Sequence, residues 1–418
     1  GNLFNSDLTS KVMRFAHIAD CHLGGWRDYK MRELVVQSFR QAIKTIIEEK
    51  VDFVLICGDM FNTAIPGIDI IKEAVTQLKK LKSAGIPVYV IPGSHDYSPS
   101  GKTVIDVLEE AEFCKNVFKG TVEDNKLFMK FTQDKSGVKL CGILGKRGEL
   151  ERHYYEMLDL KSLENEPGTK IFLYHSPIEE FKSGNLHMME ALPLSSFPKG
   201  FNYYAGGHVH TVMHKNEKGY GTFAYPGPLF PNSFSELEEL KCGGFYIVDL
   251  QENPIVKRYD IKLKDVVLIV IDCGSKTASE VSDELIENSR QANCKDAIVL
   301  IRLFGVLASG SVADIRFREA SYILYSNGAY FVMRNTRQLE SSELTIIERK
   351  AESVEEIENS VIQEHSAQIS LPGELQSKEA EVMKQLLSTL SEEKGEGETQ
   401  TEYEKRLTTN ANRILRLQ

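Results

Sequence analysis

The N-terminal part of the chain alternates short apolar runs with longer segments in which apolar residues recur at helical spacing. The runs over 13–19, 52–57 and 87–91 have the length and composition of buried strands. Between them, apolar residues over 34–47 and 68–84 recur every three or four positions, which predicts two amphipathic helices. Alternating strands and helices are typical of an α/β sheet, where polar residues at the carboxyl ends of the strands share one crevice.

After residue 126 the pattern becomes dense in strands. Predicted strands follow over 127–131, 138–143, 170–174, 201–205, 221–225, 244–250 and 255–261. A second sheet packed on the first explains them most simply. Further on, strands over 266–272, 297–303 and 329–333 alternate with helices over 278–293 and 313–324, which predicts a small α+β domain. The predicted fold class is α/β, with two packed sheets, a small α+β cap domain and a helical C-terminal tail.

These patterns predict four parts. We expect a disordered leader over 1–12, a main domain over 13–261, a cap domain over 262–338 and a tail over 339–418. The tail contains a single aromatic residue, Tyr403, and its polar composition cannot close a core of its own.

Two amphipathic helices are predicted in the tail, over about 378–390 and 402–417. Their apolar faces consist of Val382, Met383, Leu386, Leu387 and Leu390 in the first helix and of Tyr403, Leu407, Ala411, Ile414 and Leu415 in the second. We expect these faces to bind a partner protein, because they have no core to join. The alternatives are packing on the cap domain or no fixed structure.

Composition describes an ordinary globular protein. Of its residues, 42% are hydrophobic and 26% are charged. A length of 418 residues exceeds what a single hydrophobic core would hold, so we expect more than one domain. Its seven cysteines are an odd number and form no C-x-x-C pair, so the sequence suggests neither a disulfide framework nor a thiolate zinc site. This pattern fits a reducing compartment. We see neither the apolar core of a signal peptide nor the roughly 18 apolar residues of a membrane span. We therefore expect a cytoplasmic protein.

The net charge of −10 argues at first against a nucleic-acid substrate, because proteins that bind DNA usually have a basic surface. The charge is unevenly distributed, however. Residues 339–418 hold 17 acidic and 9 basic side chains, whereas the rest of the chain has a net charge of only −2. Two bound divalent cations would add about four positive charges where a phosphate must bind. The charge therefore does not exclude DNA.

Histidines and aspartates gather where the predicted strands end. The residues are Asp20, His22, Asp59, His95, Asp96, His175, His208 and His210. Each motif is weak alone, and Asp59 by itself could be a helix N-cap. Five of the ten histidines nevertheless stand at such ends beside aspartate or glycine. Because imidazole nitrogen and carboxylate oxygen suit Mn, Zn and Fe, the set as a whole predicts a metal site.

The spacing of these residues suggests how they share the metal. Alternate residues of an extended chain face the same way, so we expect this of Asp20 with His22 and of the two histidines in the run 208–210. Two ions about 3.5–4 Å apart, bridged by one carboxylate, would use all the ligands, activate a water and clamp a phosphate. We expect Asp59 to be the bridge. We expect His95, held by Asp96, to stabilise the transition state or to protonate the leaving oxygen.

The order Asp-x-His, Gly-Asp, Gly-x-His-Asp, His and Gly-His-x-His resembles the signature of the calcineurin-like metallophosphoesterases. Residues 15–24 (FAHIADCHLG) and 58–61 (GDMF) are similar to the Mre11 family of double-strand-break repair nucleases, called SbcD in bacteria. The resemblance covers about residues 13–335. It implies an αββα sandwich, two manganese ions per chain, and 3′-to-5′ exonuclease and single-strand endonuclease activity at DNA ends. It also implies a homodimer, a cap domain that binds DNA, and tail helices that bind a coiled-coil ABC ATPase of the Rad50 or SbcC type.

The resemblance also assigns roles to individual residues. It places Asp20, His22, Asp59 and His210 on one ion, and Asp59, Ser94, His175 and His208 on the other. His95 would be catalytic. The family usually has asparagine where this chain has Ser94. A hydroxyl is shorter and a weaker ligand than an amide carbonyl, so the second ion would bind weakly or through a water. One alternative is therefore a DNA-tethering scaffold with little catalysis; another is a phosphodiesterase for small substrates.

Several further residues are candidates for binding DNA. Trp26, Arg27, Tyr29 and Lys30 follow the first metal motif, and Asn62 stands where many family members have a second histidine. These residues could contact phosphates and bases, but ordinary loop packing explains the first four equally well. His17, inside the first strand, is expected to be a core histidine. The pair Lys146-Arg147 is expected to be a solvated turn.

Overall fold

The computed structural model describes residues 12–98, 101–146, 150–182, 189–341, 379–392 and 400–415. The chain divides into two compact units, Gly1–Val266 and Val267–Gln418. Apart from Val12, the expected leader lies outside the described residues, and so do residues 342–378 of the expected acidic linker. None of the helices in the described ranges combines the length and apolar character needed to cross a membrane.

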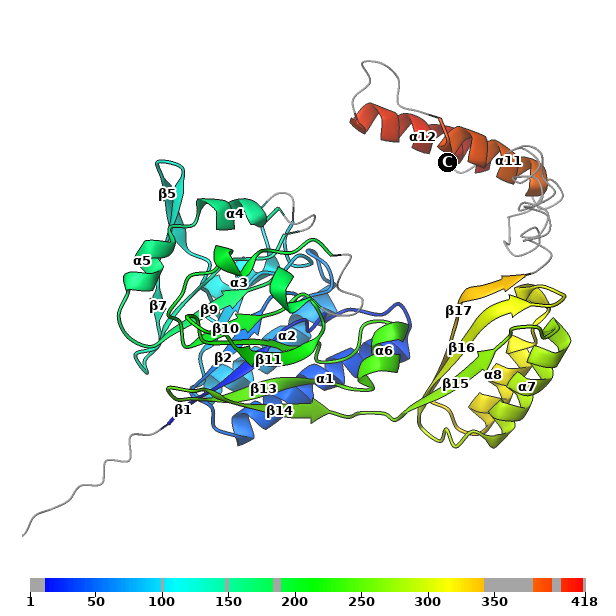
Figure 1. The fold of residues 1–418 in the computed structure, drawn as a ribbon, viewed down its shortest axis with the longest axis horizontal. Coiled ribbons are helices and arrows are strands. Elements are labelled where there is room, and N and C mark those ends of the chain that lie inside the picture. The colour runs from blue at the N-terminus through cyan, green and yellow to red at the C-terminus, as the bar shows by residue number, and fades with distance from the viewer. Residues whose placement is uncertain are drawn as a thin grey trace, which may run out of the picture. The chain divides into compact units, whose positions relative to one another are not determined.

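The first unit contains a six-stranded sheet in the order β14-β13-β1-β2-β3-β4 (Figure 1). These strands are β1 (Met13–Ile18), β2 (Phe53–Cys57), β3 (Val88–Ile91), β4 (Lys115–Asn116), β13 (Gly243–Leu250) and β14 (Ile255–Ile261). Strands β1 to β4 pair in parallel, and β13 pairs antiparallel with β1. The crossovers are α1 (Tyr29–Glu48) and α2 (Ile68–Ser83), which pack on each other. The carboxyl ends of β1, β2 and β3 therefore meet at one edge.

A second six-stranded sheet, in the order β11-β12-β10-β9-β8-β7, packs on the first. Its strands are β7 (Thr132–Gln133), β8 (Lys139–Gly142), β9 (Lys170–Tyr174), β10 (Tyr203–Gly206), β11 (Val212–Asn216) and β12 (Thr222–Pro226). The core between the sheets joins side chains such as Phe15 and Leu55 of the first sheet to Leu173 and Tyr203 of the second. The predicted two-sheet α/β sandwich is thus confirmed.

Shorter elements complete the first unit. They are α3 (Val104–Glu110), the hairpin of β5 (Gly120–Glu123) and β6 (Lys126–Met129), α4 (Arg152–Met157), α5 (Leu160–Asn165), α6 (Phe234–Leu240) and the 3-10 turns η2 (Glu179–Phe181) and η4 (Leu194–Ser196). Tyr155 of α4 and Leu163 of α5 belong to a second core on the outer face of this sheet, with Phe172 and Tyr204. Most of these elements were not predicted from the sequence, because they are too short to show a helical or strand periodicity of apolar residues.

The second unit contains the three-stranded sheet β15-β16-β17, whose strands are β15 (Val266–Asp272), β16 (Ile298–Leu307) and β17 (Phe331–Ser341). Helices α7 (Ala278–Gln291) and α8 (Phe317–Ser326) share a core with one face of this sheet, and η5 (Val312–Asp314) precedes α8. Strand β17 extends beyond the predicted range of 329–333. The second half of β17 contains few apolar residues, so the hydrophobic pattern did not predict it as strand.

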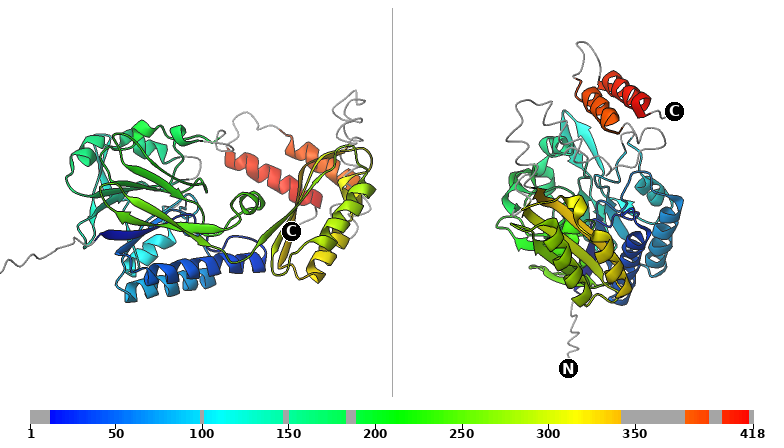
Figure 2. Two further views of the ribbon diagram at one scale, coloured as in Figure 1. Left: turned by 60° about the horizontal axis from the view of Figure 1, so that its bottom comes forward. Right: turned by 90° about the vertical axis from the view of Figure 1, so that its right-hand side faces the viewer.

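In the C-terminal tail, α11 (Glu379–Leu390) and α12 (Gln400–Leu415) contact each other (Figure 2). Tyr403 Oη donates a hydrogen bond to the carbonyl of Glu392 at 2.9 Å. Val382 is buried, with 5% of its surface exposed, whereas Leu390 is 56% exposed. The expected partner-binding faces are thus partly occupied by the pairing of the two helices. The side chain of Leu387 lies outside the described residues.

Candidate metal centre

The predicted ligands lie where parallel strands end. In the first sheet, Asp20 follows β1, Asp59 follows β2 and Ser94 follows β3; in the second, His175 follows β9 and the pair His208 and His210 follows β10. The two sheets approach each other closely here, because a Cβ atom on Gly207 would lie 2.2 Å from the carbonyl oxygen of Cys57. The packing of the sheets therefore brings both sets of side chains into one centre.

Two glycines leave room for the predicted ligands. Gly58 has a φ of +84°, and a Cβ atom there would lie 2.0 Å from His175 Nδ1. At Gly93 a Cβ atom would lie 2.2 Å from Asp59 Oδ1. Any larger residue would collide with a predicted ligand, so both glycines are required by the site.

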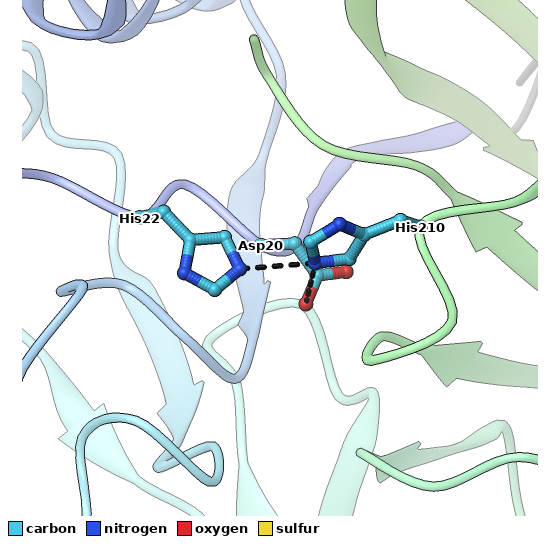
Figure 3. Close-up of side chains that lie close together, drawn as sticks. All are labelled: Asp20, His22 and His210. Atoms are coloured by element: carbon cyan, nitrogen blue, oxygen red, sulfur yellow. Dashed lines mark hydrogen bonds and ion pairs between the residues drawn. The ribbon is translucent and has the colours of Figure 1, made fainter. Parts of the chain in front are cut away.

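Asp20, His22 and His210 form the first cluster (Figure 3). The Nε2 atoms of His22 and His210 lie 3.0 Å apart, and His210 Nε2 lies 3.6 Å from Asp20 Oδ1. The three side chains point toward one another in Figure 3. Ligand atoms that share one ion about 2.1 Å away are separated by such distances.

A second cluster, Asp59, His175 and His208, adjoins the first. His175 Nε2 lies 3.2 Å from Asp59 Oδ2, and His22 Nε2 lies 3.7 Å from the same oxygen. Asp59 also belongs to a third group, with His22 and His95. Asp59 Oδ2 is thus the atom common to the two halves of the centre.

The ring nitrogens show that the residues fit a cation. His175 Nδ1 lies 2.8 Å from the carbonyl oxygen of Cys57, which can only accept, so Nδ1 carries a hydrogen and Nε2 faces the centre. His175 Nε2 is buried and makes no hydrogen bond within the described ranges. Because buried polar atoms rarely stay unpaired, divalent cations bound by this donor set explain the arrangement.

The electrostatics point the same way. Burial opposes the protonation of His175, but Asp59 and then Asp20 raise its pKa to about 10. Burial also opposes the protonation of His210, but Asp20 and Glu236 raise the pKa of this histidine to about 9. Burial would raise the pKa of Asp59, yet His175 and His22 hold it well below its usual range. Burial instead raises the pKa of Asp20. The Asp59 carboxylate is thus charged and needs positive counter-charge, which a cation would supply in place of the histidine protons.

The local backbone differs from the expected extended form. Asp20, His22, His208 and His210 have φ values of 52°, 44°, 88° and 51°, in the left-handed region. The explanation that alternate residues share a strand face was therefore wrong, because β1 ends at Ile18 and β10 at Gly206. His208 and His210 in fact join different clusters. The backbone NH of His208 donates to both carboxylate oxygens of Asp20 at 3.0 Å, which ties the two turns together.

Ser94 lies beside the shared carboxylate. It is buried, with 7% exposed, and its Oγ lies 3.5 Å from Asp59 Oδ2. The hydroxyl thus faces the carboxylate oxygen that the two halves of the centre share.

His95 and Asp96 are placed differently from what we expected. The backbone NH of His95 donates to Asp59 Oδ1 at 2.8 Å, and its Nδ1 lies 2.8 Å from the carbonyl oxygen of Asn62. Asp96 does not hold the His95 ring. Its carboxylate accepts hydrogen bonds from the backbone NH groups of Gly93, Met60 and Phe61. Asp96 is therefore a positioning residue that ties the turn after β3 to the loop after β2, and its burial with the nearby charge of Asp59 raises its pKa to about 7.

Comparison with known proteins agrees with this geometry. Residues 13–212 match the sequence model of the calcineurin-like phosphoesterases. Residues 13–212 are thus similar in sequence to a calcineurin-like phosphoesterase domain. Among curated proteins it is 31% identical over 250 residues to the DNA double-strand break repair protein Mre11 of Methanococcus maripaludis, a match covering 57% of this chain and 63% of that protein. It is 25% identical over 372 residues to the protein of that name in Archaeoglobus fulgidus, covering 83% of this chain and 79% of that protein. A solved dimetal phosphatase from Danio rerio is similar with a TM-score of 0.41 and 12% identity, covering 60% of this chain and 97% of that one.

One residue beside the candidate metal centre was missed by the sequence analysis. Glu236 Oε1 lies 2.8 Å from His210 Nδ1, and Oε2 accepts from the backbone NH of Asn232 at 2.7 Å. A carboxylate on the far nitrogen of a ligating histidine fixes its tautomer and orientation. The run from Ser233 to Glu236 signals a helix start, but nothing in the sequence links it to His210.

We expect Glu236→Gln to weaken manganese binding by about 10–100-fold, as for other residues that orient a metal ligand. Calorimetric titration of the metal-free protein measures this, with Glu239→Gln, exposed on the same helix, as the control. Equal affinities for the two variants would show that Glu236 does not support His210.

The candidate DNA-binding residues lie in the loop after β1, at the start of α1 and in the loop after β2. Trp26 is half-buried, and its Nε1 donates to the carbonyl of Pro231 at 3.0 Å, so ordinary packing occupies this edge of its ring. Arg27, Tyr29 and Lys30 are exposed, Tyr29 by 76%. Asn62 is half-buried, and its carbonyl faces His95. Of the five, Asn62 thus lies against a predicted catalytic residue.

His17, predicted to be a core residue, is confirmed as one. It is 0% exposed, and its ring nitrogens lie 2.9 Å from Tyr203 Oη and 3.0 Å from the carbonyl oxygen of Gly206. Burial lowers its pKa to about 3, so the ring is neutral in the folded protein.

Proposed function

We propose that this chain is the nuclease subunit of a double-strand-break repair complex and hydrolyses phosphodiesters at DNA ends with two manganese ions. The observation that carries the proposal is the sharing of Asp59 between two adjoining groups of ligands. Two cations held in this way suit a phosphodiester in particular, because they can clamp it during in-line attack. DNA as the substrate is supported by the similarity to archaeal proteins named DNA double-strand break repair protein Mre11.

We assign separate roles in metal binding and proton transfer to the residues of the centre. Asp20, His22, Asp59 and His210 would hold one cation, and Asp59, Ser94, His175 and His208 the other. When bound, the pair would activate a water and neutralise charge on the phosphate. His95 donates its Nδ1 hydrogen to the carbonyl of Asn62, so its Nε2 is left to transfer a proton to the leaving oxygen or to bind a phosphate oxygen. Asp96 keeps His95 in place by holding the loops on either side of it.

The proposal distinguishes DNA from small phosphodiesters. We expect manganese-dependent release of nucleotides from end-labelled duplex DNA, and cleavage of single-stranded DNA, alongside hydrolysis of bis-p-nitrophenyl phosphate. A chelator should stop all three. Hydrolysis of the small ester without any action on DNA would favour a phosphodiesterase for small substrates instead.

The tail helices would dock a coiled-coil ABC ATPase of the Rad50 type, and the chain would act as a homodimer. The pairing of α11 with α12 supports a preformed helical hairpin, and its exposed Leu390 is available for contact. Deleting residues 373–418 is then expected to abolish co-purification of the ATPase but to spare manganese-dependent hydrolysis by the isolated chain. Undiminished capture of the ATPase by the shortened chain would refute this role.

A scaffold with little catalysis is favoured by one observation, the serine at position 94. Its Oγ is 3.5 Å from Asp59 Oδ2, and a neutral hydroxyl is a poor ligand. For the nuclease we expect two binding steps in a manganese titration, of which Ser94→Asn tightens only the weaker. A single tight step, with no DNA cleavage at high manganese, would establish the scaffold instead.

A further inference from the structure

Lys146 was expected to be a solvated turn residue, but it is half-buried and held by two tyrosines. Its Nζ lies 4.8 Å from the ring centroid of Tyr97 and 4.6 Å from that of Tyr154. It also donates to Tyr154 Oη at 2.9 Å. We call these three residues the Lys146 clamp. Two aromatic faces attract the ammonium group and fix its position.

The positive charge of the clamp has no carboxylate partner among the described residues, in contrast to Lys82, which also lies over a ring but pairs with Glu112 at 3.2 Å. The nearby carboxylate of Glu151 is used otherwise. It accepts from the backbone NH of Lys146 at 3.1 Å and from Ser176 Oγ at 2.8 Å. Glu151 therefore positions the backbone of Lys146, and no carboxylate in the part of the chain that the structure describes pairs with the ammonium group.

The segments that build the clamp also build the metal centre. Tyr97 follows Asp96 directly, and Ser176 follows His175. The backbone NH of Gly145, next to Lys146, donates to the carbonyl of Pro92 at 2.9 Å, and a Cβ atom on Gly145 would lie 2.5 Å from His175 Cδ2. The clamp thus borders the centre on the side of His95 and His175.

We propose that Lys146 binds a backbone phosphate of the DNA strand next to the scissile one. This rests on the proposed function. Each strand of a duplex presents a phosphate about every 3.4 Å along the axis, so a strand in the metal centre passes other phosphates over the rim. A lysine side chain that two rings already hold in place loses little further conformational entropy when it binds a phosphate. The contact would position the strand and would not read its sequence.

The test compares Lys146→Met, which keeps the apolar stem, with Lys146→Arg. The matched control is Lys199→Met: Lys199 also lies over a tyrosine ring, 5.8 Å from that of Tyr220, but it precedes β10 at the end opposite the ligands. For Lys146→Met we expect KM on duplex DNA to rise roughly tenfold, as on loss of a charge-assisted hydrogen bond, and to rise more than KM for bis-p-nitrophenyl phosphate.

The second measurement is the salt dependence of DNA binding by the Lys146→Met variant, made with chelator so that no DNA is cleaved. The slope of log affinity for duplex DNA against log salt should fall by about one. Lys146→Arg and Lys199→Met should keep the slope of the unaltered chain.

A slope and KM for Lys146→Met equal to those of the unaltered chain would overturn the inference. So would equal losses on DNA and on the small ester, which would make the clamp purely structural. If the unaltered chain bound DNA without cleaving it, the nuclease proposal would fail, but the salt slope would still decide whether Lys146 contacts a phosphate.

Discussion

Replacing Asp59 with asparagine is expected to remove manganese-dependent hydrolysis of both DNA and the small ester. Asp59 Oδ2 lies 3.2 Å from His175 Nε2 and 3.7 Å from His22 Nε2, so both halves of the centre depend on it. An amide of the same shape offers one neutral oxygen in place of two charged ones, and two cations cannot share it. We expect manganese to bind at least about 100-fold more weakly, beyond the loss seen for residues that only orient a ligand.

A matched control separates this from a general effect of removing a buried charge. Asp134 is also buried, with 3% exposed, and accepts from Tyr89 Oη at 2.7 Å in the same domain. Asp134→Asn should lower the melting temperature yet retain manganese binding and hydrolysis. Retention of more than about a tenth of the activity by Asp59→Asn would rule out Asp59 as the bridge, because a bridging ligand serves both ions.

Replacing His95 with glutamine is expected to have the second largest effect, and a different one. The His95 ring is oriented by the carbonyl of Asn62, and its backbone NH binds Asp59 Oδ1, an interaction that glutamine keeps. We expect kcat to fall by about 10²–10⁴-fold, the range for loss of a general acid or base. Manganese affinity should stay close to that of the unaltered chain.

The comparison between catalysis and metal binding is decisive for His95, because this residue also lies within reach of His22 and Asp59. If manganese affinity falls together with kcat, His95 is a ligand and its assignment as the catalytic residue is wrong. His214→Gln, on an exposed position of β11, controls for the loss of an imidazole elsewhere. Its kcat and manganese affinity should match those of the unaltered chain.

Much of the centre was predictable because parallel strands bring their carboxyl ends together. The apolar runs before Asp20, Asp59 and His175 were visible in the sequence, and each proved to be a buried strand. Once these runs are assigned to two packed sheets, residues more than a hundred positions apart must meet. Residue type and position were therefore enough to predict that these side chains lie close together.

Local geometry was less predictable, because it depends on contacts that periodicity does not encode. The left-handed backbone at His208 and His210 follows from turns that begin once β10 has ended. Asp96 looked like a partner for the adjacent histidine, but it satisfies backbone NH groups of another loop. Glu236 reaches His210 only through the docking of α6. Lys146 looked solvated because its two tyrosines lie in other segments.

Anomalous diffraction from crystals soaked in manganese tests the central claim most directly. We expect two peaks per chain, about 3.5–4 Å apart, with the Asp59 carboxylate between them. Asp20, His22 and His210 should surround one peak, and His175 and His208 the other. A single peak at saturating manganese, or two peaks that do not share Asp59, would contradict the account.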